Sequence, residues 1–214
     1  MKTKKQALLF SVCAVLLIAA SVFGTVAYLT AEKQVVNIFT VGAVDIKLDE
    51  AKTDESGSAV AGAERVTANS YKLLPGHTYT KDPTVTVLQG SESAYIKMTV
   101  TFTKSAELDT VFAPDGADMT SIFGGYDKAT WIYKGNTEDA AENTRTYEFW
   151  YKETVDASGA DRKLASLFDT ITVPGSVTGE QLQTIADMTI TVNAYAIQAD
   201  GFATADAAWE AFGK

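Results

Sequence analysis

Hydrophobic and polar residues alternate along much of the chain, and this alternation predicts β-strands. The clearest run covers residues 94–103, where Ile96, Met98, Val100 and Phe102 share one face and lysine and threonine occupy the other. A period of two places successive side chains on opposite faces of a strand, so one face of this run is free to enter a core. Alternation with one polar face is typical of antiparallel sheets rather than of βαβ units.

Further segments share this pattern and are rich in β-branched and aromatic residues, which favour strands. Turn signals such as Pro75-Gly76 and Pro174-Gly175 separate them. The predicted strands lie around residues 44–48, 84–87, 131–133, 147–151, 168–173 and 188–197. So many short strands predict an all-β fold, an antiparallel, jelly-roll-like β-sandwich. The polar, small-residue segment 49–69 is expected to form a mobile loop.

One helix is predicted, at the C-terminal end over residues 204–212. Thr204 is a suitable N-cap, and Asp206 places a negative charge in the first turn. The apolar residues of this segment recur at i, i+3, i+4 and i+7 on one face: Ala205, Ala208, Trp209 and Phe212. We expect its aromatic residues to dock on the sandwich, and the alternative is a helix that binds a partner.

The first 27 residues have the pattern of a secretory signal peptide. Lysines within the first five residues precede a long uncharged, apolar stretch. The small residues Thr25 and Ala27 fit the −3 and −1 positions of a signal peptidase site, which predicts cleavage between Ala27 and Tyr28. The alternative is an uncleaved membrane anchor, because the stretch is long enough to span a bilayer. Cleavage would leave an extended segment, residues 28–42, and a sandwich domain, residues 43–214.

Charge and composition restrict the classes of function. The chain has a formal net charge of −9, and without the three leader lysines 15 basic and 27 acidic residues remain, a net charge of −12. Such an acidic chain is repelled by nucleic acid, so no nucleic-acid partner is expected. The single cysteine, Cys13, lies in the leader, and the single histidine is His77. We therefore predict no disulfide, no Cys/His zinc site and no cofactor.

No residue pattern of a known catalytic site is present, so we predict that the protein is not an enzyme. His77 follows a Pro-Gly turn, and no nucleophile motif accompanies it. Asp115 and Asp118 offer oxygen ligands for calcium but lack the calcium-loop pattern, and solvated loop acids are the default interpretation. Trp150 is predicted to point outward on its strand and is a candidate glycan contact. The alternative is that a loop or the C-terminal helix covers it.

Four short motifs, in a consistent order along the chain, resemble the TasA/camelysin group of secreted bacterial proteins with a SipW-dependent-type signal peptide. They are GTVAYLT at residues 24–30, NIFTVGAV at 37–44, LPGHTYTKDP at 74–83 and AYAIQADGF at 194–202. The resemblance implies a jelly-roll domain that is exported by a dedicated signal peptidase. Camelysin-type relatives are described as metallo-endopeptidases, but one histidine cannot supply the HExxH motif, so that activity is not carried over.

The resemblance also implies a mode of assembly, because some relatives form biofilm matrix fibres in which an extended N-terminal segment completes the sheet of the next subunit. Here that segment falls within residues 28–42, and its candidate strand-donor residues are Val35, Val36, Ile38, Phe39 and Val41. The alternative is that this segment pairs within its own subunit. We expect a secreted structural protein of the bacterial cell surface or biofilm matrix. The alternative function is a carbohydrate-binding surface module that contacts a matrix or surface polysaccharide.

Overall fold

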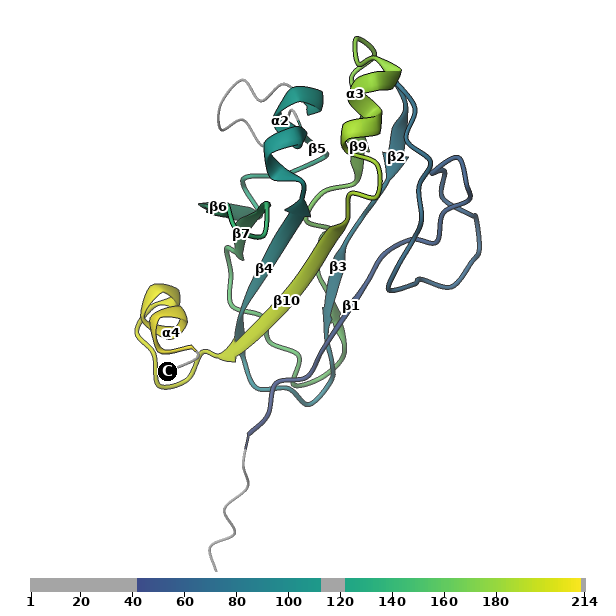
Figure 1. Ribbon diagram of the computed structural model, residues 1–214. Coiled ribbons are helices and arrows are strands. Elements are labelled where there is room, and N and C mark those ends of the chain that lie inside the picture. The colour runs from purple at the N-terminus through teal and green to yellow at the C-terminus, as the bar shows by residue number, and fades with distance from the viewer. Residues whose placement is uncertain (1–41, 113–121, 213–214) are drawn as a thin grey trace, which may run out of the picture. The chain divides into compact units, whose positions relative to one another are not determined.

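The computed structural model describes residues 42–112 and 122–212 (Figure 1). This part of the chain is mostly β, with antiparallel sheets and a short C-terminal helix, which confirms the predicted class at that level. The predicted leader, its cleavage site at Ala27 and Tyr28, and the five candidate strand-donor residues lie outside the described residues. Asp115 and Asp118 lie outside them as well.

A four-stranded antiparallel sheet forms one layer, in the order β10-β4-β7-β6. Its strands are β4 (Ala94–Thr103), β6 (Trp131–Asp139), β7 (Thr144–Tyr151) and β10 (Ile190–Gln198). The alternate residues of β4 that the sequence assigns to the core are fully buried: Ile96, Met98, Val100 and Phe102. The other face of β4 is partly exposed, so the predicted alternation is confirmed.

Two three-stranded sheets, β1-β3-β8 and β2-β9-β5, make up the rest of the β-structure. Their strands are β1 (Ile46–Asp49), β2 (Thr78–Thr80), β3 (Thr84–Val87), β5 (Phe123–Gly124), β8 (Arg162–Lys163) and β9 (Thr170–Thr172). Backbone hydrogen bonds continue between the two sheets, from Lys81 N to the Asp169 carbonyl (2.9 Å) and from Leu167 N to the Pro83 carbonyl (3.0 Å). The two small sheets therefore form one interrupted layer.

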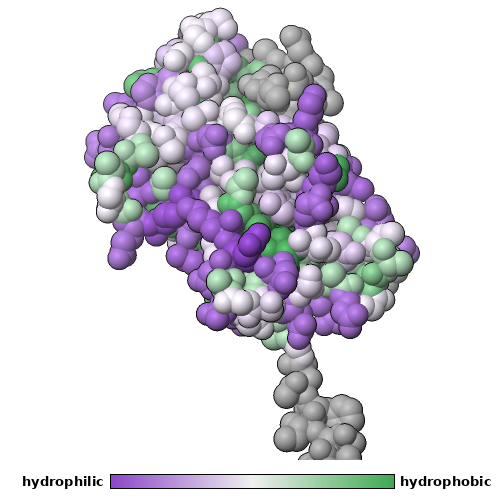
Figure 2. All heavy atoms as spheres, turned by 180° about the vertical axis from the view of Figure 1, so that it is seen from behind, coloured by the Kyte–Doolittle hydropathy of each residue, from purple (hydrophilic) through white to green (hydrophobic). Residues whose placement is uncertain are grey.

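One hydrophobic core joins this interrupted layer to the four-stranded sheet. Phe123 of β5 is fully buried, and its ring centroid lies 5.8 Å from those of Phe102 and Tyr147 and 6.0 Å from that of Phe149. Phe168 stacks on Phe123 from the same layer, with 4.5 Å between the centroids. Seen from the side opposite to Figure 1, the surface mixes hydrophilic and intermediate residues, with strongly hydrophobic residues near the centre and smaller hydrophobic areas elsewhere (Figure 2).

Three helices are described: α2 (Ser105–Phe112), α3 (Gly179–Thr184) and α4 (Ala205–Ala211). Only α4 is predicted by the sequence analysis. Thr204 is its N-cap and accepts a hydrogen bond from Ala207 N, as expected. Trp209 is 7% exposed whereas Phe212, the C-cap residue, is 41% exposed, so only part of the predicted aromatic face is buried. No helix in the described ranges is long and apolar enough to cross a membrane.

Candidate binding groove

Strand β10 is an edge of the four-stranded sheet, and it lacks two of the usual protections against strand pairing, a charged side chain and a bulge. Its nine residues include no charged side chain, and they pair with β4 without a bulge. The opposite edge, β6, contains Lys134, Glu138 and Asp139 and has a register shift between Tyr133 and Gly135. Charged residues and bulges are the devices by which proteins block unwanted pairing at a sheet edge. Of the two edges, β10 is thus the one open to a further strand.

The hydrogen bonds that flank β10 show which of its backbone groups face outward. Thr103 N donates to the Thr189 carbonyl (3.1 Å), and Ala199 N donates to the Ser93 carbonyl (2.7 Å). In an antiparallel ladder, residues alternate between bonding the partner strand and pointing away from it. The odd-numbered residues of β10 therefore bond β4, and the even-numbered residues, from Ile190 to Gln198, direct their N–H and C=O groups away from it. Within the described part of the chain, β10 pairs with no other strand.

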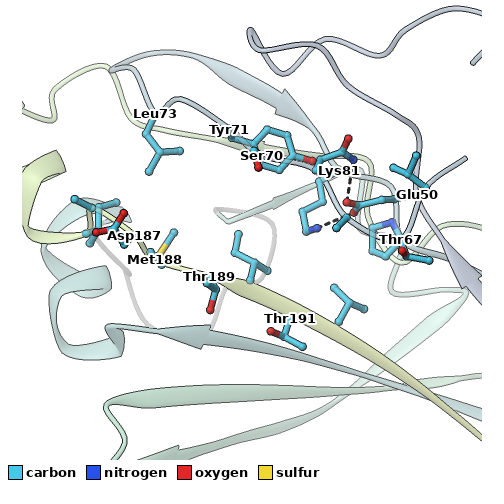
Figure 3. Close-up of a pocket in the computed structure, with 18 of the residues that line it drawn as sticks. Glu50, Thr67, Ser70, Tyr71, Leu73, Lys81, Asp187, Met188, Thr189 and Thr191 are labelled. Carbon is cyan, nitrogen blue, oxygen red and sulfur yellow. Dashed lines mark hydrogen bonds and ion pairs between the residues drawn. The ribbon is translucent and has the colours of Figure 1, made fainter.

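An open groove of about 970 Å³ lies beside the first three residues of β10 (Figure 3). One wall consists of residues 182–183 in α3, the connecting residues 185–189 and the first three residues of β10, 190–192. The other wall consists of residues 48–50 at the end of β1, residues 66–71 with Leu73, and Lys81 and Pro83. β1 and β10 are neighbours in the fold, so the groove separates the edges of the two layers.

A buried ion pair lies in the wall opposite β10. Lys81 Nζ donates to Glu50 Oε2 at 2.7 Å, and the two residues are 8% and 6% exposed. Asn69 Nδ2 donates to Glu50 Oε1 at 2.9 Å and to the Ala51 carbonyl at 2.8 Å. Figure 3 shows Glu50 and Lys81 across the groove from Thr189 and Thr191 of the other wall. We call Glu50, Lys81 and Asn69 the polar cluster.

Tyr71 adds a neutral polar group to the same wall. Its hydroxyl donates to the Thr80 carbonyl at 3.0 Å. Burial, and next the negative charge of Glu50, raise the pKa of Tyr71 to about 12. The phenol therefore stays protonated through the physiological pH range, and the wall carries no charge at this position.

Arg65 holds the segment that forms this wall. Its guanidinium bonds the Asp49 carboxylate at 2.5 Å and the Asp82 carboxylate at 2.7 Å, and Nη2 donates to Thr84 Oγ1 at 2.9 Å. Burial alone would raise the pKa of Asp49, but hydrogen bonds from Lys47 and Arg65 and their positive charges hold it below its usual value. Segment 49–69, expected to be a mobile loop, is thus tied to both β1 and the start of β3.

Trp150 lies on the outer face of β7, where the sequence analysis places it, and it is half-buried. Its ring centroid lies 6.2 Å from that of Trp209 in α4, and Lys134 Nζ lies 3.9 Å from its ring centroid. Its indole Nε1 donates to Glu148 at 2.6 Å. Of the two arrangements that the sequence leaves open, Trp150 adopts the one beside the C-terminal helix. Its assignment as a glycan contact stays a prediction.

His77 is engaged in packing rather than placed beside a nucleophile. Its ring lies 4.7 Å from that of Tyr79, and Nε2 lies 2.5 Å from the Ser56 carbonyl. Over residues 42–112 and 122–212, no group of histidine, cysteine, aspartate and glutamate side chains converges in a way that could hold a metal ion.

No protein-family model matches the chain, and no curated protein or solved structure is significantly similar to it. The sequence analysis did not identify the groove residues Glu50, Lys81 and Asn69. Lys81 falls outside every predicted strand, so no sequence pattern marks it.

Proposed function

We propose that the chain is a secreted, non-enzymatic structural protein of the bacterial cell surface or biofilm matrix that associates with copies of itself by strand addition. In this proposal, signal peptidase cleaves the leader between Ala27 and Tyr28, and the domain is a jelly-roll-like β-sandwich. The resemblance to the TasA/camelysin group supports export and fibre formation. N-terminal sequencing of the exported chain tests the leader, because it should begin at Tyr28.

The observation that carries the proposal is the unprotected edge of β10 beside a groove. Every second residue of β10 offers an outward N–H and C=O, which can pair with an incoming backbone. The adjoining groove can receive alternate side chains of the same incoming strand. Backbone pairing supplies affinity and side-chain pockets supply specificity, which is how peptides add to sheet edges. Residues 28–42 are the proposed incoming segment.

The alternative, a carbohydrate-binding module, depends on an accessible aromatic platform. Lys134 and Trp209 already flank the ring of Trp150, so the described geometry favours strand addition over sugar stacking. A pull-down on surface polysaccharide with the native chain and with Trp150→Ala separates the two functions. Equal retention of both chains would remove Trp150 as a glycan contact.

A row of four threonines crosses the sheet and provides a matched test of the β10 edge. Thr137 of β6 lies opposite Thr146, which lies opposite Thr101, which lies opposite Thr191 of β10. The two end residues are both exposed, so Thr191→Lys and Thr137→Lys make the same change at the two edges. A lysine on an edge strand opposes further pairing.

We expect Thr191→Lys to lower assembly of the mature chain by at least about tenfold, equivalent to about 1.4 kcal/mol, and Thr137→Lys to leave it near the native level. Light scattering and negative-stain electron microscopy measure the assembly, and circular dichroism verifies the fold of both variants. Equal assembly of the two variants would contradict strand addition at β10. A native chain that stays monomeric at all concentrations would contradict self-association itself.

A further inference from the structure

The polar cluster has hydrogen-bonding capacity that the described residues leave unused. A lysine ammonium has three N–H donors, and the one partner of Lys81 in the described ranges is Glu50. Burying a charged pair costs free energy unless further hydrogen bonds satisfy it, and unmet donors add to that cost. The groove therefore offers a polar group of an incoming strand a place beside Lys81 and Glu50.

Apolar side chains line the same groove as this cluster, among them Leu48, Leu73, Ile185, Met188 and Val192, and they alternate with polar ones such as Asp187, Thr189 and Thr191. A strand that enters this groove needs a polar residue where it meets the polar cluster and apolar residues where it meets the apolar part of the lining. A single buried polar contact of this kind is the best-attested way in which proteins fix register, because every other register leaves a polar group unpaired.

The segment before the described domain has one face of that composition. In an extended chain, Val35, Asn37, Phe39 and Val41 point to one side, and Val36, Ile38 and Thr40 point to the other. The first face carries one amide among three apolar side chains. An asparagine side chain offers a carbonyl oxygen to the ammonium of Lys81 and an amino group to the carboxylate of Glu50.

We propose that Asn37 of one copy enters the groove of a neighbouring copy and bonds the polar cluster there, which fixes the register and the inward face of the added strand. This inference rests on the proposed function, because it requires strand addition at the groove. It deepens that function by naming the face of the segment that enters and the residues that recognise it.

The path of the chain favours a neighbouring copy over the same copy. The described chain begins at Gly42, and the Ala43 and Asp45 carbonyls accept hydrogen bonds from Glu92 N (3.0 Å) and Leu88 N (2.9 Å). These bonds place the entry at the start of β1, whereas the end of β1 lines the groove. In Figure 1 the described chain enters at the bottom of the view, and α3, which leads into the groove wall, lies at the top.

Pairing within one copy would also miss the polar cluster. A chain reversal at Gly42 would set Asn37 opposite position 47, because paired residues are equally distant from the turn. Position 47 is three residues, or about 10 Å, short of Glu50. By contrast, residues 28–41 can extend over about 46 Å, enough to reach an adjacent molecule.

Disulfide cross-linking tests the inference directly, because the mature chain has no cysteine of its own. One sample carries Asn37→Cys and a second carries Asn69→Cys, and they are mixed and oxidised during assembly. We expect disulfide-linked dimers between the two chains. The matched control replaces Asn37→Cys with Ile38→Cys on the opposite face, and we expect the loss of those dimers. Thr67→Cys, at an exposed position of the same wall, repeats the test in case Asn69→Cys unfolds the domain.

Each outcome has a distinct meaning. Dimers with position 37 and not with position 38 support the inference. Dimers with position 38 alone, or assembly without any dimer, overturn the inference and leave self-association standing. A disulfide between Asn37→Cys and Asn69→Cys within one doubly substituted chain would show pairing inside one copy and overturn it too. Absence of assembly in the native chain would instead overturn the proposed function.

Discussion

Arg65 is the residue on which the position of the groove wall depends most. It bonds both the buried Asp49 and Asp82, and it donates to the backbone carbonyls of both residues. Removing the guanidinium leaves the Asp49 carboxylate buried without this partner. We expect Arg65→Met to lower the free energy of unfolding by about 3 kcal/mol, measured by urea denaturation.

Arg162 of β8 provides the control for this prediction, because it is an arginine with an exposed side chain. Arg162→Met should change the free energy of unfolding by less than about 0.5 kcal/mol. Similar losses in the two variants would show that Arg65 contributes only as an ordinary surface charge.

Tyr71 makes stability depend on pH in the alkaline range. Its pKa is about 12 in the folded chain and about 10 in an unfolded one, so the folded state holds the phenol proton more tightly. The resulting stabilisation is complete below pH 10 and is lost as the pH rises toward 12. Tyr71→Phe should cost about 1 kcal/mol at neutral pH, because it loses the hydrogen bond to Thr80, but it should lose less stability between pH 9 and 11.5.

Urea denaturation at several pH values measures this difference, and the difference absorbance spectrum of phenolate gives the titration of Tyr71 itself. Parallel declines of stability in the native chain and in Tyr71→Phe would show that other groups cause the alkaline loss.

The sequence predicts the buried residues of regular strands but not the polar contacts of the groove. Ile96 and Val100 follow a period of two, which depends only on neighbouring positions. Lys81 meets Glu50 from 31 positions away, and Arg65 meets Asp82 from 17 positions away. No local sequence pattern specifies partners that are so distant. From the sequence alone, the side chains of Lys81 and Arg65 are therefore expected to lie in solvent.

At the scale of elements, α4 depends on one aromatic anchor. Trp209 lies against Trp150, and Lys97 Nζ lies 4.6 Å from its ring centroid. Replacing it with alanine removes a nearly buried indole and should cost about 3 kcal/mol or more of the stability of the docked helix. We expect Trp209→Ala to expose Trp150, which would shift the tryptophan emission to longer wavelength and increase its quenching by iodide.

Phe212→Ala is the comparison for α4, because Phe212 packs on the same surface but is 41% exposed. It should change the quenching much less. Unchanged quenching in Trp209→Ala would mean that Trp150 is covered independently of the helix.

Elements with a long periodic pattern are the ones that the sequence predicts. β4 and α4 are found because each carries several apolar residues at a constant spacing. α3 has a capping box at Thr178 and Gln181 but buries no residue, so no apolar stripe marks it. α2 begins directly after β4. The residue between them, Lys104, has a positive φ of 56°, and because this position is not a glycine the sequence does not mark the turn. β5 and β8 have two residues each, too few for any alternation.

At the scale of the whole molecule, the groove exists because two strand edges from distant parts of the chain become neighbours. β1 begins at Ile46 and β10 at Ile190, and the sequence shows neither that they adjoin nor that both lie at sheet edges. The sequence does show that β10 has no charged residue. This lack of charge indicates an unprotected edge only when the structure shows that β10 lies at the edge of its sheet.

The net charge that remains once the proposed leader is removed bears on assembly. That charge is −12, and on every copy it would oppose association, whereas β10 itself carries no charged side chain. Salt should then act mainly by screening repulsion between copies, since the Debye length falls from about 20 Å at 0.02 M to about 6 Å at 0.3 M. We expect light scattering to show faster assembly at the higher salt concentration, with Thr191→Lys assembling at least about tenfold less than the native chain at both concentrations. Slower assembly in salt would instead indicate attraction between opposite charges on adjacent copies, and such an interface would have to lie away from β10.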